Sequence, residues 1–344
     1  MINKFSAKKY FISLIVSTTV LLIAACASNK NDVDVSDIKI EQKHLRFEKD
    51  LFSHDSISVE TVMQLRNTYG TFFDLFTHRV IHLPPTNDTL LAANLNAFVH
   101  DKDVQDIFIR TKSVFTDSDV KNVFEGIENF CKHLKYYFPE KIIPDVVTYV
   151  SAFNYNVITT DSVLGIGLDM YLGSNCEFYP SLQIPEYMYK KYSKAYLVND
   201  CIKGWFQSEY DVDLVKKELL GQMIYYGKLL YFTDLMAPDA NDSIKIGYTS
   251  EQVKWCVQNQ SQMWAYYLEQ KLLYNTNEIE YMKYISDGNT TQGFPKGAPA
   301  KTAQWIGWQI VKAYMQRNNV SLLQLLNEKD AQKILDESGY KPSS

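Results

Sequence analysis

The sequence has no histidine after His133, although the chain runs to residue 344. This absence excludes any catalytic or metal site built on an imidazole from the remainder of the chain. The sequence also lacks a G-x-x-x-x-G-K-[ST] phosphate loop and a G-x-S-x-G nucleophile motif. We therefore expect neither a P-loop nucleotide site nor a serine hydrolase site.

Cysteines are few, and none is part of a C-x-x-C pair or a Cys/His cluster, so a structural zinc site is not expected. The four that follow Cys26 are an even number, which permits two disulfides in an oxidising compartment. They are Cys131, Cys176, Cys201 and Cys256. The alternative is four buried free thiols, because a large core does not need disulfides, and the sequence leaves both open.

Positive charge is also in short supply, with 35 lysines and arginines against 40 acidic residues and a net charge of −5. Residues 1–25 contain three lysines and no acidic residue, so their removal lowers the net charge by three, to −8. This balance argues against nucleic acid as a partner and against attachment to anionic lipid through a basic surface.

The N-terminus has the pattern of a bacterial lipoprotein signal. A basic start precedes a mostly apolar run over residues 10–25, which ends in Ala24-Ala25 before Cys26. We predict that residues 1–25 are a signal peptide and that the thiol of Cys26 is acylated. The run is short and interrupted by serine and threonine, which disfavours the alternative of an uncleaved spanning helix.

These features predict a protein that works in the cell envelope and is held to the bilayer by lipid on Cys26. The periplasmic side of the outer membrane is the expected location, with the inner membrane as the alternative. The polar residues 26–37 form the expected tether, and residues 38–344 the expected single domain, because no Pro/Gly-rich linker divides them.

Periodicity predicts an α+β domain that is mostly helical. Ser58 and Asp88 are expected to cap early helices, and Thr249-Ser-Glu-Gln252 is expected to form a capping box. Alternating β-formers over residues 145–172 predict a β-hairpin or small antiparallel meander. Helices follow again, including a long apolar one that ends at Met236.

Several segments, taken in order, resemble the GldB family of gliding-motility lipoproteins of Bacteroidetes. They are Leu-Gly-Ile-Gly-Leu-Asp-Met-Tyr-Leu-Gly at 164–173, Met-Ile-Tyr-Tyr-Gly-Lys at 223–228, Trp-Ile-Gly-Trp-Gln-Ile-Val at 305–311 and Ser-Gly-Tyr-Lys-Pro at 338–342. The resemblance implies an envelope lipoprotein associated with gliding and with the secretion machinery on which gliding depends. It also implies a distant likeness to zincin-like metallopeptidases.

The resemblance implies a zincin-like plan, but the H-E-x-x-H motif of those enzymes is missing. The corresponding helix offers Glu218, Gln222 and Tyr226 on one face, and a carboxylate with a neutral amide makes a poor zinc site. We expect a vestigial site with no catalytic residue, metal or cofactor. Gly227 costs about 1 kcal/mol in mid-helix relative to alanine, which close packing would explain.

The predicted function is therefore a non-catalytic binding or assembly role, with envelope proteins as partners. The alternative is a hydrolase with a non-histidine site among Glu177, Glu186 and Glu218. Two further candidates are Trp305 and Trp308, which flank Gly307 near the C-terminus. They form either part of the core or an exposed aromatic surface for a partner.

Overall fold

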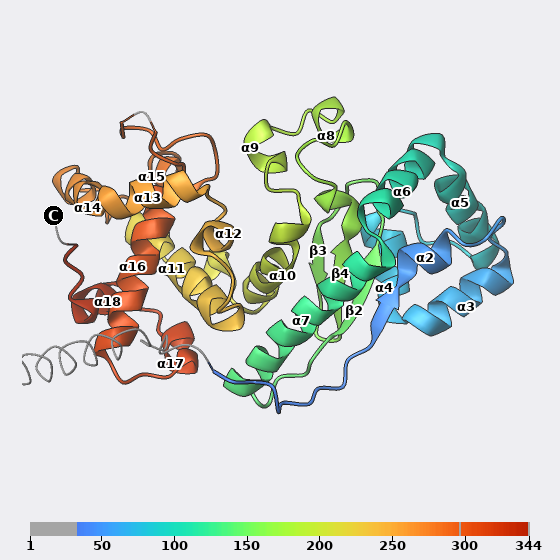
Figure 1. Ribbon diagram of the computed structural model, residues 1–344, viewed down its shortest axis with the longest axis horizontal. Coiled ribbons are helices and arrows are strands. Elements are labelled where there is room, and N and C mark those ends of the chain that lie inside the picture. Colours follow the sequence, from blue (N-terminus) through green and yellow to red (C-terminus); the bar gives the residue numbers. More distant parts are fainter. Residues whose placement is uncertain (1–32, 296, 343–344) are drawn as a thin grey trace, which may run out of the picture. The chain divides into compact units, whose positions relative to one another are not determined.

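The computed structural model describes residues 33–295 and 297–342, and Figure 1 shows their arrangement. The predicted signal peptide, the acylation site Cys26 and most of the tether lie outside the described residues. From Val35 onward the described chain belongs to one unit of contacts. No described helix combines the length and the apolar character that crossing a membrane would require.

The sheet is small and mixed. Its strands are β1 (His44–Arg46), β2 (Asp145–Tyr149), β3 (Val157–Thr159) and β4 (Val163–Gly167), in the spatial order β1-β2-β4-β3. The predicted antiparallel hairpin is formed by β3 and β4, whereas β2 pairs in parallel with both β1 and β4. The prediction of an antiparallel meander over 145–172 is therefore wrong for its first strand, β2, which pairs in parallel. The reason is burial: β2 is buried on both faces and takes a central position, whereas the less buried β3 lies at one edge.

Helices make up most of the fold, which confirms the α+β class. Before the second strand they are α2 (Phe47–Leu51), α3 (Val59–Tyr69), α4 (Thr71–Leu75), a π-helical turn η2 (Phe76–Val80), α5 (Asp88–His100), α6 (Lys102–Val114) and α7 (Asp117–Tyr137). Ser58 caps α3 as expected, by accepting a hydrogen bond from the Thr61 N–H. The cap of α5 is Asn87, one residue before the predicted Asp88.

The second half of the chain is helical after the sheet. Its elements are η3 (Leu168–Tyr171), α8 (Phe178–Ser181), α9 (Glu186–Tyr189), α10 (Lys194–Glu209), η4 (Val212–Leu214), α11 (Leu219–Met236), α12 (Asp242–Ile246), α13 (Ser250–Gln258), α14 (Gln260–Glu269), α15 (Glu278–Ile285), α16 (Thr302–Arg317), α17 (Leu322–Asn327) and α18 (Ala331–Ser338). The capping box at Thr249 and Gln252 forms as predicted and starts α13.

The two faces of the sheet belong to two apolar clusters. Val147 and Tyr149 belong to a cluster built with α2 to α5, whereas Val146 belongs to the larger cluster that contains residues of α7, α10, α11 and α16. Figure 1 shows α2 to α5 on one side of the sheet and α10, α11 and α16 on the other. This division follows from the period of two along a strand. The four cysteines after the signal are buried free thiols in the larger cluster or against it, so the disulfide alternative is not realised.

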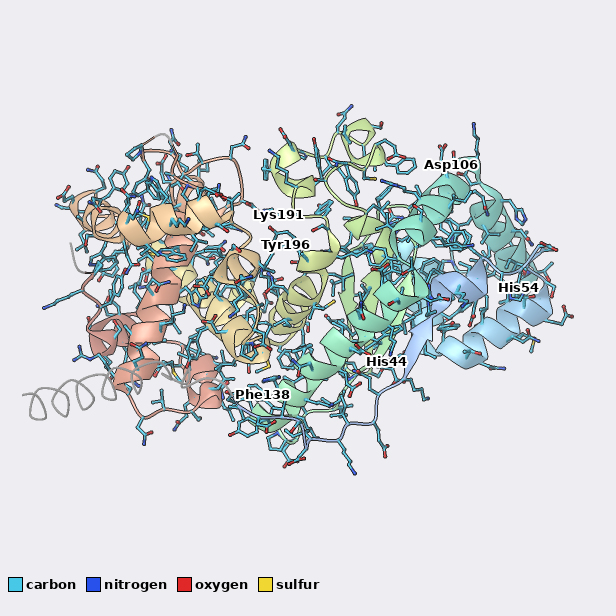
Figure 2. All side chains as sticks on the ribbon, viewed as in Figure 1. His44, His54, Asp106, Phe138, Lys191 and Tyr196 are labelled. Atoms are coloured by element: carbon cyan, nitrogen blue, oxygen red, sulfur yellow. The ribbon has the colours of Figure 1, made fainter. Side chains whose placement is uncertain are left out.

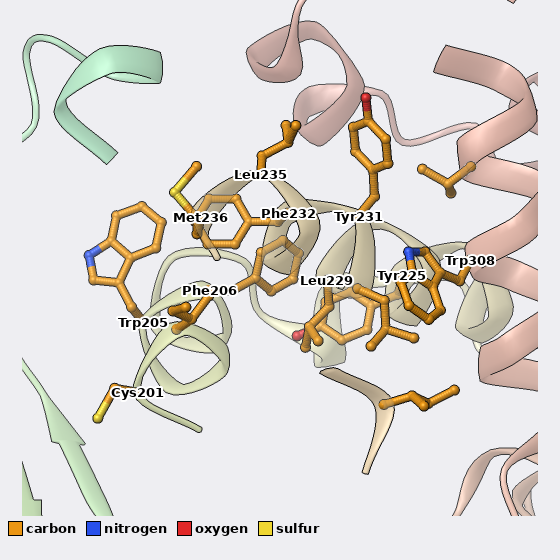
Figure 3. Close-up of a cluster of buried hydrophobic side chains, with 14 of the residues drawn as sticks. Cys201, Trp205, Phe206, Tyr225, Leu229, Tyr231, Phe232, Leu235, Met236 and Trp308 are labelled. Atoms are coloured by element: carbon orange, nitrogen blue, oxygen red, sulfur yellow. The ribbon is translucent and has the colours of Figure 1, made fainter. Parts of the chain in front are cut away.

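The larger cluster is centred on α11, which is buried at nearly every position (Figure 3). It touches α16 backbone to backbone. A Cβ built on Gly307 would lie 1.8 Å from the carbonyl oxygen of Met223, and one built on Gly227 would lie 2.3 Å from the carbonyl oxygen of Gly307. Close packing therefore does explain the mid-helix glycine of α11, and its counterpart is Gly307.

Both candidate tryptophans lie in the core beside this crossing. Trp305 is 2% exposed and Trp308 is fully buried, and their rings meet edge to face at 5.7 Å. The indole N–H of Trp308 donates a hydrogen bond to Asp234 of α11 over 2.8 Å. Neither ring is available as an exposed surface in this structure.

We expect Gly307→Ala to lower the free energy of unfolding by about 1–3 kcal/mol or more, because the new methyl group would collide with backbone that cannot rotate away. Urea denaturation measures the change. Gly288→Ala is the matched control, since a Cβ there would make only an ordinary 3.8 Å contact with Ala300. Equal stability of the two variants would show that the helices can separate without cost.

We expect Trp308→Ala to lower the free energy of unfolding by roughly 3–5 kcal/mol, the range for truncating a buried aromatic residue. Thermal and urea melts measure this. Trp264→Ala, at a half-buried tryptophan, should cost less. An unchanged melt of Trp308→Ala, together with lost recovery of envelope partners, would instead favour the aromatic-surface alternative.

Candidate functional site

The predicted vestigial site lies at the N-terminus of α11. Glu218 is the residue before the first turn, with extended backbone, and its carbonyl oxygen accepts the N–H of Gln222. The residue is 4% exposed, and its carboxylate forms an ion pair with Lys216 at 2.8 Å. Gln222 is buried and Tyr226 half-buried, with the ring of Tyr226 edge to face with that of Tyr225 at 5.2 Å.

A cavity of about 410 Å³ opens beside this helix end, between α11 and the segment around α17 and α18. Glu218 lines it, but Gln222 and Tyr226 do not. The structure therefore does not bring the three predicted residues together around one space. On the helix face that they share, Glu218 lies at this cavity, whereas Gln222 and Tyr226 pack against the rest of the protein.

The polar groups of this cavity are mostly engaged by the protein itself. The ammonium group of Lys228 donates to the carbonyl oxygen of Glu328, and burial lowers the pKa of Lys228 to about 8. The hydroxyl of Tyr225 donates to the carbonyl oxygen of Tyr210 over 2.8 Å. Such an arrangement fixes the walls of the cavity, with Glu218 and Lys228 as its charged side chains on α11.

The three carboxylates of the enzyme alternative each face a different cation. Glu177 lies 3.8 Å from Arg110, Glu186 lies 2.8 Å from Lys190, and Glu218 pairs with Lys216. Of the three, only Glu218 lines the cavity beside α11. In the described part of the chain, no three His, Cys, Asp or Glu side chains are grouped closely enough to hold a metal ion.

A second cavity contains charged residues that sequence reasoning missed. It measures about 330 Å³ and is lined by three lysines and two aspartates, which we call the lysine pocket: Lys191, Asp200, Lys203, Asp287 and Lys301. Lys191 and Tyr196, both in its wall, are labelled in Figure 2 at the start of α10. No sequence signal joins these residues, because they come from segments up to 110 residues apart, from Lys191 to Lys301, and lysine is ordinarily a surface residue.

Comparison with known proteins gives one match. A family model described as gliding motility protein GldB matches residues 28–342. No curated protein and no solved structure matches the chain, so the zincin-like plan stays a prediction. Because the match spans nearly all of the sequence, it establishes the family, and the chain belongs to the GldB family of gliding motility proteins.

Proposed function

We propose that this protein is a lipid-anchored component of the cell envelope with a non-catalytic binding or assembly role. Membership of the GldB family supports a part in gliding or in the secretion machinery associated with it. The Ala24-Ala25-Cys26 sequence supports attachment by acyl chains, with the periplasmic side of the outer membrane as the location and the inner membrane as the alternative. Envelope proteins are the proposed partners.

The observation that carries the non-catalytic role is the packing of α11. The resemblance to zincin-like enzymes implies that this helix corresponds to the one that carries their zinc ligands, and its middle is packed against the backbone of α16. The side chains at the relevant positions, Gln222 and Tyr226, are a neutral amide and a phenol. Zinc-dependent hydrolysis needs imidazole or carboxylate ligands with an open coordination position, which these side chains do not supply.

One observation favours the alternative of a hydrolase. Glu218 is a buried carboxylate on the wall of a cavity large enough for a small ligand, and Lys228 of the same cavity has a lowered pKa of about 8. Acid–base catalysis uses groups of this kind. The ion pair of Glu218 with Lys216 and the hydrogen bond of Lys228 to Glu328 argue instead for a structural role.

Cys26→Ser should release the protein from the membrane fraction, because it removes the predicted acylation site and the net charge of −8 on the mature chain disfavours attachment to anionic lipid. Fractionation followed by immunoblotting measures the release. Ala27→Ser, which alters the neighbouring residue and keeps the thiol, should remain in the pellet. Quantitative pelleting of Cys26→Ser after a salt wash would rule out lipid as the main attachment.

Glu218→Ala and Gln222→Ala should support colony spreading and secretion as well as the parent gene in a deletion strain of the source bacterium, because neither residue performs chemistry in this proposal. Protein levels and melting temperatures must be measured alongside. Gly307→Ala serves as the control that loses function through instability. A stably folded, normally abundant Glu218→Ala protein without function would support the hydrolase instead.

A further inference from the structure

The lysine pocket gathers side chains from four parts of the chain around one cavity of about 330 Å³. Lys191 follows α9, Asp200 and Lys203 lie on α10, Asp287 follows α15, and Lys301 immediately precedes α16. The walls between them include the rings of Tyr192 and Tyr196 and the backbone of two glycines, Gly204 and Gly247. Three ammonium groups face two carboxylates, so the pocket carries an excess of one positive charge when all five are ionised.

The charges are not evenly paired within the pocket. Asp287 serves two lysines: its Oδ2 forms an ion pair with Lys191 and lies 3.7 Å from the ammonium group of Lys301. Asp200 accepts a hydrogen bond from the hydroxyl of Tyr171 over 3.2 Å. Among the described residues, the Lys203 ammonium group makes no hydrogen bond or ion pair, and Asp200 and Asp287 attract it only at longer range.

Burial makes this excess charge costly. Lys301 is only 8% exposed, and its one ion-pair partner, Asp287, is shared with Lys191, so the loss of hydration of its ammonium group is only partly compensated. Burial lowers the pKa of Lys301 to about 7, with further lowering by Lys191 and Lys203 against the opposing effect of Asp287 and Asp200. Burial also lowers the pKa of Lys203 and raises that of Asp200.

The backbone holds Lys301 in place at a further cost. Lys301 has φ 49° and ψ 37°, the left-handed conformation that residues with a Cβ rarely adopt. Opposite it, Gly247 has φ 77°, and a Cβ there would lie 3.5 Å from the Lys301 ammonium group and 3.2 Å from Cδ of Lys191. Strain of this kind is typical of functional positions, where the surrounding structure holds a side chain in a required orientation.

We propose that the lysine pocket binds a small anionic molecule, through a phosphate or carboxylate group placed between Lys203, Lys301 and Lys191. An oxyanion there supplies the acceptor that Lys203 lacks and balances the excess positive charge. Tyr192 and Tyr196 would contact the rest of the molecule, whose size is limited by the cavity. This site is separate from the cavity beside Glu218 and does not depend on the membrane anchor or on the family's role.

Sulfate is the cleanest first probe, because its charge is constant near neutral pH while that of phosphate changes. Isothermal titration of the full-length lipoprotein in detergent, with chloride at equal ionic strength as the reference, measures binding. We expect saturable binding of sulfate at pH 6. Affinity should fall as pH rises through about 7, up to about tenfold by pH 8, because Lys301 loses its proton over this range.

The ionisable groups facing Lys301 determine this pH dependence. They are Lys191, Lys203, Asp200, Asp287 and the phenols Tyr192, Tyr196 and Tyr248. Burial raises the pKa of each of these three phenols, so they stay neutral below pH 8. Asp287 has a lowered pKa because Lys301 and Lys191 outweigh its burial, so it stays charged. Burial lowers the pKa of both Lys301 and Lys203, so these are the groups whose protonation the bound anion should favour.

Lys203→Met should weaken sulfate binding at least tenfold, because it removes the unpaired cation and keeps most of the side-chain volume. The matched control is Lys190→Met, at an exposed lysine near the pocket that pairs with Glu186 at 2.8 Å and does not line the cavity. Asp200→Asn should tighten binding, since it removes a negative charge. This opposite change keeps the test valid if Lys203→Met fails to fold.

Phosphate and succinate, compared at pH 6, then distinguish the two sources of the anion. Tighter binding of phosphate assigns the pocket to phosphorylated molecules, and tighter binding of succinate assigns it to carboxylates. The proposal is overturned if no anion binds more tightly than chloride. It is also overturned if a folded Lys203→Met protein binds sulfate like the Lys190→Met control.

Discussion

The crossing of α11 and α16 is the constraint on which the second half of the structure depends. Gly227 and Gly307 allow two long helices to touch through their backbones, and no residue with a Cβ fits at position 307. Each glycine costs about 1 kcal/mol of helix propensity relative to alanine. The close contact offsets this cost by bringing long rows of apolar side chains into dispersion range, Trp308 and Leu229 among them (Figure 3).

Both cavities lie at the ends of these crossing helices. The cavity beside Glu218 lies at the first turn of α11, and the lysine pocket includes Lys301, the residue before α16. Because the crossing fixes the two helices against each other, it also fixes the positions in space of their N-terminal ends. The positions of Glu218 and Lys301 are thus consequences of packing, and each cavity has a rigid wall on one side. Such walls would allow a small ligand to bind in either cavity without closure of a loop.

Local sequence signals account for much of the fold and little of the pockets. The helix caps at Ser58 and Thr249 and the close packing at Gly227 could be predicted from the neighbouring sequence. A cap stabilises a helix end and a mid-helix glycine destabilises a helix, so each has a direct physical reason. The parallel pairing of β2 with β4 could not, because a buried strand shows no alternation that distinguishes its partners. That Lys203 and Lys301 line the same pocket could not be predicted from the sequence, since their proximity comes from tertiary packing across about a hundred residues.

Two buried charge clusters in the fold show how a structural site differs from a binding site. Asp234 on α11 is satisfied on every side: the Trp308 indole donates to it, Lys245 lies 3.0 Å away and Lys312 lies 3.6 Å away. Lys312 also lies 3.7 Å from the centre of the Trp308 ring. This cluster is closed, because Lys245 and Lys312 share the carboxylate of Asp234 and every charged group therefore has an ion-pair partner within the protein. In the lysine pocket the ammonium group of Lys203 makes no direct hydrogen bond or ion pair with the described residues, although Asp200 and Asp287 attract it at longer range, and an open cavity lies beside it. Charged groups that all have ion-pair partners within the protein serve the fold, whereas a charged group without one beside an accessible cavity is suited to a ligand.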